Sequence, residues 1–451
     1  MDRRELIKAL GVACGGVFLT ACGGGGSGIP GESSLIPPNY RFVSLLKSSQ
    51  PLPGIGKPLS FAGAAQINAL GQFAFVGRDA RKRSGLYLGR LDWADLSNRL
   101  DNLNALDASA LAGFVKVVEP GDSLPDRSVA AKIESFALSE SGSLFMRVMN
   151  TRGEHGLFVR PLSGALQRVV GYGDALPGGG GRFAHCIGDF EAHDDDSLVM
   201  VGHFLGNKHH GQGLFHLPRG GVAGGRRIAS TLDTLPNSTD RISMFGLVDT
   251  NGRDCAHQVF IHMAPLTTTA LGSTARSPGN ALLVAPTADT MMVSKINAAS
   301  TTVMLPASLR AATRSGESHH GPRQNRAGQV AGVTTEGQVQ TLHIDGNTVL
   351  STGQKTPTGR TIGGLLGPIP GVGNQFFIVA QIEPRGCEVL VTDGRDVRSV
   401  AFDGQRIGNF EVEQFGLGGV RNQTDSTGRF VCAVKYRDQR TGLVAAIPVG
   451  S

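Results

Sequence analysis

One stretch of the chain concentrates side chains that could bind a metal ion. Eight of the twelve histidines lie between His185 and His262, among several carboxylates. Imidazole and carboxylate groups together suit transition metals, and carboxylates alone suit Ca²⁺. The residues that form this candidate ligand cluster are His193, Asp194, Asp196, His203, His209 and His210.

The spacing within this cluster matches no metal-binding motif such as His-Glu-x-x-His. The run from His193 to Asp196 and the pair His209-His210 fall in two different turns, on the same rim of the fold or on opposite rims. We therefore favour a polar loop whose acidic run begins a strand. We expect no cofactor, and a metal ion is the less favoured alternative.

No catalytic motif stands out elsewhere. The four glycines Gly178–Gly181 are not followed by the Lys-Ser/Thr of a phosphate-binding loop, so they indicate a flexible turn. The Gly-x-Ser-x-Gly elbow of hydrolases does not occur. One tryptophan and four tyrosines are a poor supply of rings for stacking on sugars. No catalytic residue is assigned, and whether the protein is an enzyme stays open.

Charge and cysteine content exclude two further classes of function. The net charge of +6 over 451 residues is small and is not gathered into a basic run, so nucleic-acid binding has no support. The four cysteines outside the N-terminal region are scattered without a Cys-x-x-Cys pair: Cys186, Cys255, Cys387 and Cys432. We expect buried thiols there rather than disulfides.

A repeated pattern predicts the elements that must position any site. The sequence LQRVVGYGDALP at Leu166–Pro177 joins an apolar strand to a Gly-Asp turn and a Leu-Pro stop. The Asp174 side chain is expected to hydrogen-bond the backbone that follows it. Variants occur at Phe42–Pro53, Phe114–Pro125, Arg226–Pro236, Asn347–Pro357 and Val397–Gly408.

Two more landmarks recur between these copies. A turn that mostly ends in glycine precedes an alternating strand seven times, about every 60 residues from Gly71 to Gly428. A Gly-Leu-aromatic triplet, such as Gly156-Leu157-Phe158, follows most copies. Each unit then holds four short strands, which predicts an all-β, seven-bladed β-propeller with four-stranded blades.

The ends of the chain predict how the ring closes. The apolar strand at Arg41–Leu46 stands alone, and the last repeat lacks a fourth strand, so the N-terminal strand should complete the last blade. Residues 41–451 would then be one propeller domain. The alternatives are an open solenoid and two separate β domains.

Two insertions interrupt the repeats. Asp92–Leu111 places Leu96, Leu100, Leu103 and either Leu106 or Leu111 on one helical face. This spacing predicts one short helix packed on the ring, and a partner-binding helix is the alternative. Leu266–Asn280 reads as a polar loop, and the strands between Ala281 and Arg310 stay unassigned.

The first residues resemble a bacterial export signal. Leu19-Thr-Ala-Cys22 is similar to the lipobox of bacterial lipoproteins, in which the cysteine is lipidated and becomes the new N-terminus. The resemblance implies lipidation of Cys22 and a signal peptide over residues 1–21. Arg3 and Arg4, followed by Glu-Leu-Ile-Lys, resemble a twin-arginine signal, although Asp2 stands where Ser or Thr is usual. The alternative is the positive region of a general secretory signal.

Residues 22–40 would link the lipid to the domain. The 17 residues Gly23–Asn39 are rich in Gly, Ser and Pro and show no strand pattern, so they predict a tether with a span of roughly 20–25 Å. The resemblance implies a protein of the bacterial cell envelope, periplasmic or surface-facing, attached to the outer membrane because Gly23 rather than Asp follows the cysteine.

The repeat itself resembles a family of uncharacterised secreted bacterial propeller-like proteins over residues 41–449, and this resemblance carries no activity. We expect a monomeric, membrane-anchored platform that binds or scaffolds a protein or glycan partner. The alternatives are a purely structural surface protein and a cell-surface enzyme, glycan-active or metal-dependent, with its site at the His/Asp-rich third blade or in the central channel.

Overall fold

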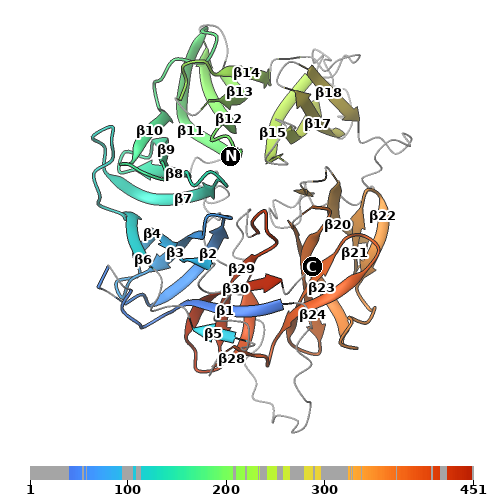
Figure 1. The fold of residues 1–451 in the computed structure, drawn as a ribbon. Helices are drawn as coiled ribbons and strands as arrows, with labels where there is room; N and C mark the ends of the chain where they lie inside the picture. Colours follow the sequence, from blue (N-terminus) through green and yellow to red (C-terminus); the bar gives the residue numbers. More distant parts are fainter. Residues whose placement is uncertain are drawn as a thin grey trace.

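Figure 1 shows the computed structural model of the protein. It describes residues 40–448 except 53–54, 57, 94–104, 108–112, 207–209, 219–220, 232, 234–240, 251–256, 265–278, 288–289, 296–322, 326, 328, 337, 372, 408–409 and 417–423. All of the elements described are strands. The signal, lipobox and tether predicted for residues 1–39 lie outside the described residues.

The chain forms successive four-stranded antiparallel sheets. The first holds β2 (Phe61–Ile67), β3 (Gln72–Arg78), β4 (Ser84–Arg90) and β6 (Gly113–Val118). The second holds β7 (Ala130–Leu138), β8 (Leu144–Asn150), β9 (His155–Arg160) and β10 (Gln167–Gly171). The third holds β11 (Gly181–Ala192), β12 (Leu198–Gly206), β13 (His210–Leu217) and β14 (Arg226–Ser230).

The second half of the chain repeats this plan. The fourth sheet holds β15 (Arg241–Thr250), β16 (His257–Ala264), β17 (Gly279–Thr287) and β18 (Thr290–Lys295). The fifth holds β19 (Arg323–Gln324), β20 (Val330–Glu336), β21 (Val339–Ile344) and β22 (Asn347–Ser351). The sixth holds β23 (Thr361–Pro370), β24 (Phe376–Glu383), β25 (Cys387–Thr392) and β26 (Val397–Phe402). The last sheet is built on β28 (Phe410–Gly416), β29 (Phe430–Tyr436), β30 (Thr441–Pro448) and β1 (Tyr40–Lys47), with β27 (Arg406–Ile407) and β5 (Ala105–Asp107) at its edges.

The sheets stand around a common centre, which is the arrangement of a β-propeller (Figure 1). Each sheet contacts the next, and β2 of the first sheet contacts β29 and β30 of the last. The apolar core is correspondingly divided into clusters between adjoining sheets; one of them joins Phe75 of the first sheet to Leu443 of the last. The prediction of an all-β chain of four-stranded antiparallel units is confirmed.

The first strand of the described chain completes the last sheet, as predicted. β1 pairs antiparallel with β30, so that Tyr40 lies opposite Pro448, Phe42 opposite Ala446 and Lys47 opposite Gly442. Without β1, β30 would present an open edge able to pair with another chain. Every residue of β1 except Arg41 is buried, so this strand is part of the core.

One part of the predicted helical insertion is wrong. Residues Ala105–Asp107 form β5, which pairs in parallel with Phe42–Ser44 of β1. The outer edge of β1 offers unpaired N–H and C=O groups, and a short strand satisfies them where a helix would not. The remainder of the Asp92–Leu111 insertion from residue 94 on, and the predicted polar loop up to residue 278, lie outside the described residues. The region left unassigned from the sequence begins with β17 and β18.

The glycine-ended turns of the described residues connect the first two strands of a sheet, and in four of them the first side chain accepts the backbone N–H of the residue four positions later: Asn68, Ser139, Asn325 and Asp425. Asn68 Oδ1 accepts the Gln72 backbone N–H at 3.0 Å, and Asp425 Oδ1 accepts that of Arg429 at 3.0 Å. The last residue of the turn needs a positive φ, which Gly71 and Gly428 adopt without strain. In the third sheet Asp196 takes this position, with φ of 65°.

Where the structure describes them, the Gly-Asp turns connect one sheet to the next, and their polar side chain bonds to the backbone that precedes it. Asp174 Oδ2 accepts the N–H of Gly171, three residues earlier, at 2.9 Å. The expected bond to the following backbone is therefore wrong. Four other copies make the same bond to the residue three positions earlier: Asp122, Asp233, Gln354 and Gln405.

The Gly-Leu-aromatic triplets have a steric cause. Gly156 and Phe158 lie on the same face of β9, and a Cβ added to Gly156 would come within 2.6 Å of the Phe158 ring. Gly213 and Phe215 repeat the relationship in β13, also at 2.6 Å. Glycine thus makes room for a buried ring two residues later.

Candidate binding site

The structure does not bring the predicted ligand cluster together. His193 to Asp196 form the turn between β11 and β12, whereas His203 lies toward the other end of β12 and His210 begins β13 opposite Leu205. The two groups therefore lie at opposite ends of the third sheet. His209 lies outside the described residues. In the ranges that the structure describes, no three His, Cys, Asp or Glu side chains are placed to hold a metal ion.

The acidic turn makes structural contacts instead. Asp196 Oδ1 accepts a hydrogen bond from the Ser139 hydroxyl of the second sheet at 2.8 Å, and another from the Ser141 hydroxyl. Asp195 accepts the backbone N–H and hydroxyl of Ser197. These bonds close the turn and join it to the neighbouring sheet.

His193 is a core residue. Its side chain is 1% exposed, and its ring lies edge-on to that of His216 with 6.2 Å between centroids. Burial lowers the pKa of His193 to about 4, against the opposing effect of Asp195. The imidazole is consequently uncharged at neutral pH.

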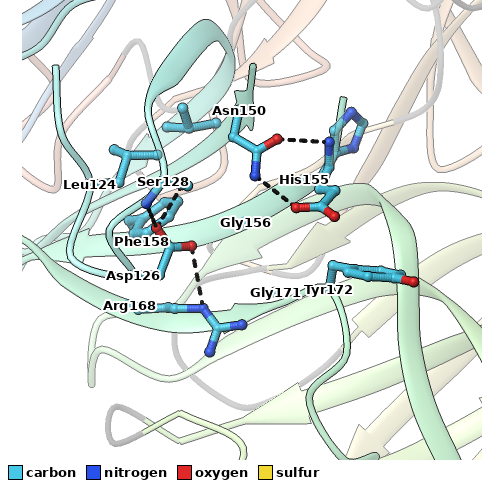
Figure 2. A pocket seen from close by; sticks show the side chains of 12 residues that line it. Leu124, Asp126, Ser128, Asn150, His155, Gly156, Phe158, Arg168, Gly171 and Tyr172 are labelled. Carbon is cyan, nitrogen blue, oxygen red and sulfur yellow. Dashed lines mark hydrogen bonds and ion pairs between the residues drawn. The ribbon is translucent and has the colours of Figure 1, made fainter. Parts of the chain in front are cut away.

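A polar pocket lies over the second sheet, at the opposite end of the strands from the glycine-ended turns (Figure 2). Its volume is about 40 Å³, room for a few water molecules. The lining comes from the link before β7, the ends of β8 and β10 and the start of β9. The lining residues are Leu124, Asp126, Ser128, Val148, Asn150, Glu154, His155, Gly156, Phe158, Arg168, Gly171 and Tyr172.

Hydrogen bonds fix the polar side chains of the pocket. Asn150 Nδ2 donates to Glu154 Oε2 at 2.9 Å, and Asn150 Oδ1 accepts the Glu154 N–H at 3.1 Å. On the other side, Asp126 Oδ1 accepts the Ser128 hydroxyl at 2.6 Å, and Asp126 Oδ2 lies 3.7 Å from Arg168 Nε. Figure 2 shows Arg168 and the Asn150 pair on opposite sides of the pocket. The donors and acceptors are thus preorganised.

The Arg168 guanidinium has little freedom to move. Its Nη1 contacts Asp174 Oδ1 at 2.9 Å, so the Gly-Asp turn of this repeat positions it. A Cβ added to Gly171 would come within 2.8 Å of Arg168 Nη2. Glycine at position 171 therefore lets the guanidinium lie flat against the backbone.

His155 connects the pocket to an ion-pair cluster between the second and third sheets. Its Nε2 lies 3.4 Å from Glu134 Oε2, which Arg147 Nε also approaches at 3.2 Å. Its Nδ1 lies 3.3 Å from the Ile187 backbone nitrogen, so with the Nε2–H tautomer it accepts that N–H. Burial lowers the pKa of His155 despite the Glu134 carboxylate, which favours the neutral ring.

This cluster satisfies backbone groups that a β-bulge removes from the ladder. β11 is irregular on both sides of Ile187. Arg147 Nη1 donates to the Ile187 carbonyl at 3.0 Å and also to that of Gly188. Buried carbonyls left without partners would destabilise the sheet, so Arg147 and Glu134 have a structural role beside the pocket.

The sequence did not identify these pocket residues. His155 of the pocket and its neighbours Glu134 and Arg147 in the adjoining ion-pair cluster come from three strands, and only the sheet register brings them together. Tyr172 is the residue before Gly173-Asp174, a position occupied by Pro120 in the preceding copy and Thr352 in a later one. The aromatic residue at this variable position of the repeat was the one feature of the sequence that could have indicated the pocket.

The cysteines are free thiols where the structure describes them. Cys387 and Cys432 are buried and Cys186 is partly buried, and none of the three forms a disulfide. Burial raises the pKa of Cys387 to about 12 and raises that of Cys432 as well. Cys255 lies outside the described residues.

The sequence matches no protein-family profile, and no curated protein is significantly similar to it. Among solved structures, it is similar to the acylaminoacyl peptidase of Pyrococcus horikoshii with a TM-score of 0.44 and 10% identity, over 87% of this chain and 52% of the peptidase. The chain thus spans about half the length of that enzyme. It is similar to polysaccharide lyase Uly1, with a TM-score of 0.44 and 11% identity over 89% of this chain and 93% of the lyase.

A putative TolB from Agrobacterium tumefaciens gives a TM-score of 0.35 and 13% identity, over 75% of this chain and 95% of that one. All three scores are below 0.5, so these similarities establish no shared activity or ligand. In the part of the chain that the structure describes, no helix has the length and apolar character needed to span a membrane.

Proposed function

We propose that this protein is a lipoprotein of the bacterial cell envelope whose closed, seven-bladed propeller serves as a binding platform. The observation that carries the proposal is the place of β1. This strand begins at Tyr40, directly after the predicted tether, and lies in the last sheet between β30 and β5. A lipid on Cys22 would therefore hold the propeller through a strand of its own core.

Contacts between the sheets support the closed ring. Glu140, in the second sheet, accepts the backbone N–H of Ala69 in the first sheet and of Ser426 in the last. Arg429 of the last sheet donates to the Ala69 carbonyl and lies over the Trp93 ring at 4.6 Å. Bonds of this kind link the two ends of the chain directly, as a closed propeller requires.

The polar pocket supports binding as the activity of the platform. Its groups are held by hydrogen bonds within the protein, and no motif assigns them a reaction. The alternative of a metal-dependent enzyme gains no support, since the described members of the candidate cluster lie at opposite ends of the third sheet.

The anchoring part of the proposal is tested at Cys22. We expect Cys22→Ala to abolish incorporation of an alkyne-tagged fatty acid and to release the protein from the membrane fraction, because the thiol is the point of attachment. Cys14→Ala, within the predicted signal, is the matched control and should retain both. Labelling of Cys22→Ala equal to that of the parent would contradict the proposal.

The export route is tested with the two arginines. Arg3→Lys together with Arg4→Lys keeps the positive charge of the signal but removes the arginine pair. Accumulation of uncleaved protein in the cytoplasm is the result expected for twin-arginine export. Normal export would assign the chain to the general secretory route.

Ring closure is tested by a disulfide across the first and last strands. Val43 lies opposite Ala445 in the ladder, so Val43→Cys with Ala445→Cys should form a crosslink on oxidation. Val43→Cys with Val148→Cys, which lies in the second sheet, should not. Equal crosslinking of the two pairs would argue against closure through β1.

A further inference from the structure

An exposed aromatic ring stands at the rim of the polar pocket. Tyr172 is 49% exposed, whereas the other exposed large apolar side chains of the described residues are aliphatic. Aromatic residues are 6% of the chain, and its other described rings are largely buried between the sheets. Figure 2 shows the Tyr172 ring beside Gly171, at the edge of the pocket. A ring in this place offers a flat apolar surface next to fixed polar groups.

The groups within the pocket match hydroxyls. Asp126 and Glu154 supply carboxylate acceptors, and Asn150 and Arg168 supply N–H donors. A hydroxyl group both donates and accepts hydrogen bonds. A pocket that offers both acceptors and donors therefore suits a hydroxyl better than an ion. The volume of about 40 Å³ admits one substituent of a sugar, so the ring of the sugar must lie outside, against Tyr172.

The charges around the pocket favour a neutral ligand. The positive charge of Arg168 is paired with the carboxylates of Asp174 and Asp126. The one Arg or Lys side chain of the lining is thus already paired within the protein, so it offers an acidic polymer no free positive charge.

The pocket also faces away from the predicted tether. Tyr40 lies opposite Pro448, at the end of the sheet that carries the glycine-ended turns, whereas Lys47 lies opposite Gly442 at the other end. The pocket lies at the end of the second sheet that corresponds to Lys47, opposite the glycine-ended turns. The two ends of the sheet are about 20 Å apart along β8. A ligand would therefore approach from the side opposite the anchor.

We propose that this pocket is a carbohydrate-binding site that stacks a neutral sugar unit on Tyr172 and inserts one of its substituents between Asp126, Asn150 and Arg168. The proposal rests on the platform function and names its ligand class. The protein would thus hold a neutral glycan at the side of the propeller that is turned away from the membrane.

The test uses the full-length protein in detergent on an array of neutral hexose and N-acetylhexosamine oligosaccharides beside uronic-acid ones. We expect binding to neutral oligosaccharides that is insensitive to salt. For the best-bound oligosaccharide, titration should show affinity about tenfold weaker for Tyr172→Ala and retained for Tyr172→Phe. Leu205→Ala, which removes another exposed side chain, is the control and should bind like the parent.

Three results would overturn the proposal: binding to no neutral oligosaccharide, binding only to uronic-acid chains with loss at high salt, or unchanged affinity of Tyr172→Ala. Thermal unfolding of each variant checks that the fold is intact. Cys22→Ala should bind the same oligosaccharides, so failure of anchoring and failure of sugar binding give separate results.

Discussion

The side chain of Glu140 accepts the backbone N–H of Ser426, 286 positions later in the chain, at 2.7 Å. Its other carboxylate oxygen accepts the N–H of Ala69 at 2.8 Å. One carboxylate thus joins the glycine-ended turns of the second, first and last sheets. It lies where the first sheet meets the last.

Glu140→Ala should destabilise the protein, because two backbone N–H groups lose a charged acceptor. We expect the free energy of unfolding to fall by about 1–3 kcal/mol, measured by urea denaturation. Glu413→Ala is the matched control, because Glu413 makes a solvent-exposed ion pair with Lys435. This replacement should lower the free energy of unfolding by less than about 1 kcal/mol. Equal losses in the two variants would show that the contact does not join the sheets.

Gly213→Ala should destabilise the third sheet. The new Cβ would come within 2.6 Å of the buried Phe215 ring, and such overpacking costs about 1–3 kcal/mol. Gly113→Ala is the control, because nothing lies within 4 Å of its added Cβ. Urea midpoints of both variants check the prediction, and a stable Gly213→Ala protein would refute the steric account of the triplet.

Asp196→Ala should be more destabilising than Asp196→Gly. Both variants lose the acceptor for Ser139 and Ser141, but alanine must also adopt a φ of 65°, which costs about 1 kcal/mol more than glycine. Asp196→Asn keeps an acceptor and tolerates this φ, so it should lose least. Thermal midpoints in the order Asn, Gly, Ala would confirm both roles of the side chain, and any other order would count against them.

His193 should make stability fall as the pH decreases. Its folded pKa of about 4 lies below the unfolded value of about 6.5, so the unfolded state binds a proton first. The free energy of unfolding that His193 contributes is complete above pH about 6.5, falls as the pH drops to about 4, and is constant below. The total change is about 3 kcal/mol, set by the difference between the two pKa values.

The His193→Gln variant should lose less stability than the parent between pH 7 and pH 5. The urea midpoint at the two pH values measures this pH dependence. The difference between parent and variant is the readout, because other titrating groups are common to both. An unchanged slope in His193→Gln would mean that the ring is charged in the folded protein.

The sequence predicted the sheets well because the same local chemistry marks each of them. Turns that need a positive φ at Gly71 and Gly428, and triplets such as Gly156 to Phe158, recur whatever lies between them. The pairing of β1 with β30 followed from a count of strands at the two ends of the chain. These features depend on neighbouring residues, so one sequence is enough to reveal them.

The features that the sequence did not predict depend on tertiary packing. Ala105–Asp107 form a strand because β1 has a free edge, which the leucine spacing of the insertion cannot show. The pocket depends on the register that brings His155 beside Glu134, and the cluster behind it depends on the irregular course of β11 at Ile187. Conversely, the histidines that are close in sequence are separated by the length of β12.

The pairing of β1 with β30 also decides how the protein would resist being pulled from its anchor. Tension on the lipid would enter at Tyr40 and run along the axis of β1. The ladder from Tyr40 to Lys47 would then be loaded in shear, with its hydrogen bonds sharing the force rather than opening one after another. If the proposed lipid anchor exists and is pulled along β1, it would therefore load the propeller in the mechanically stronger of the two directions.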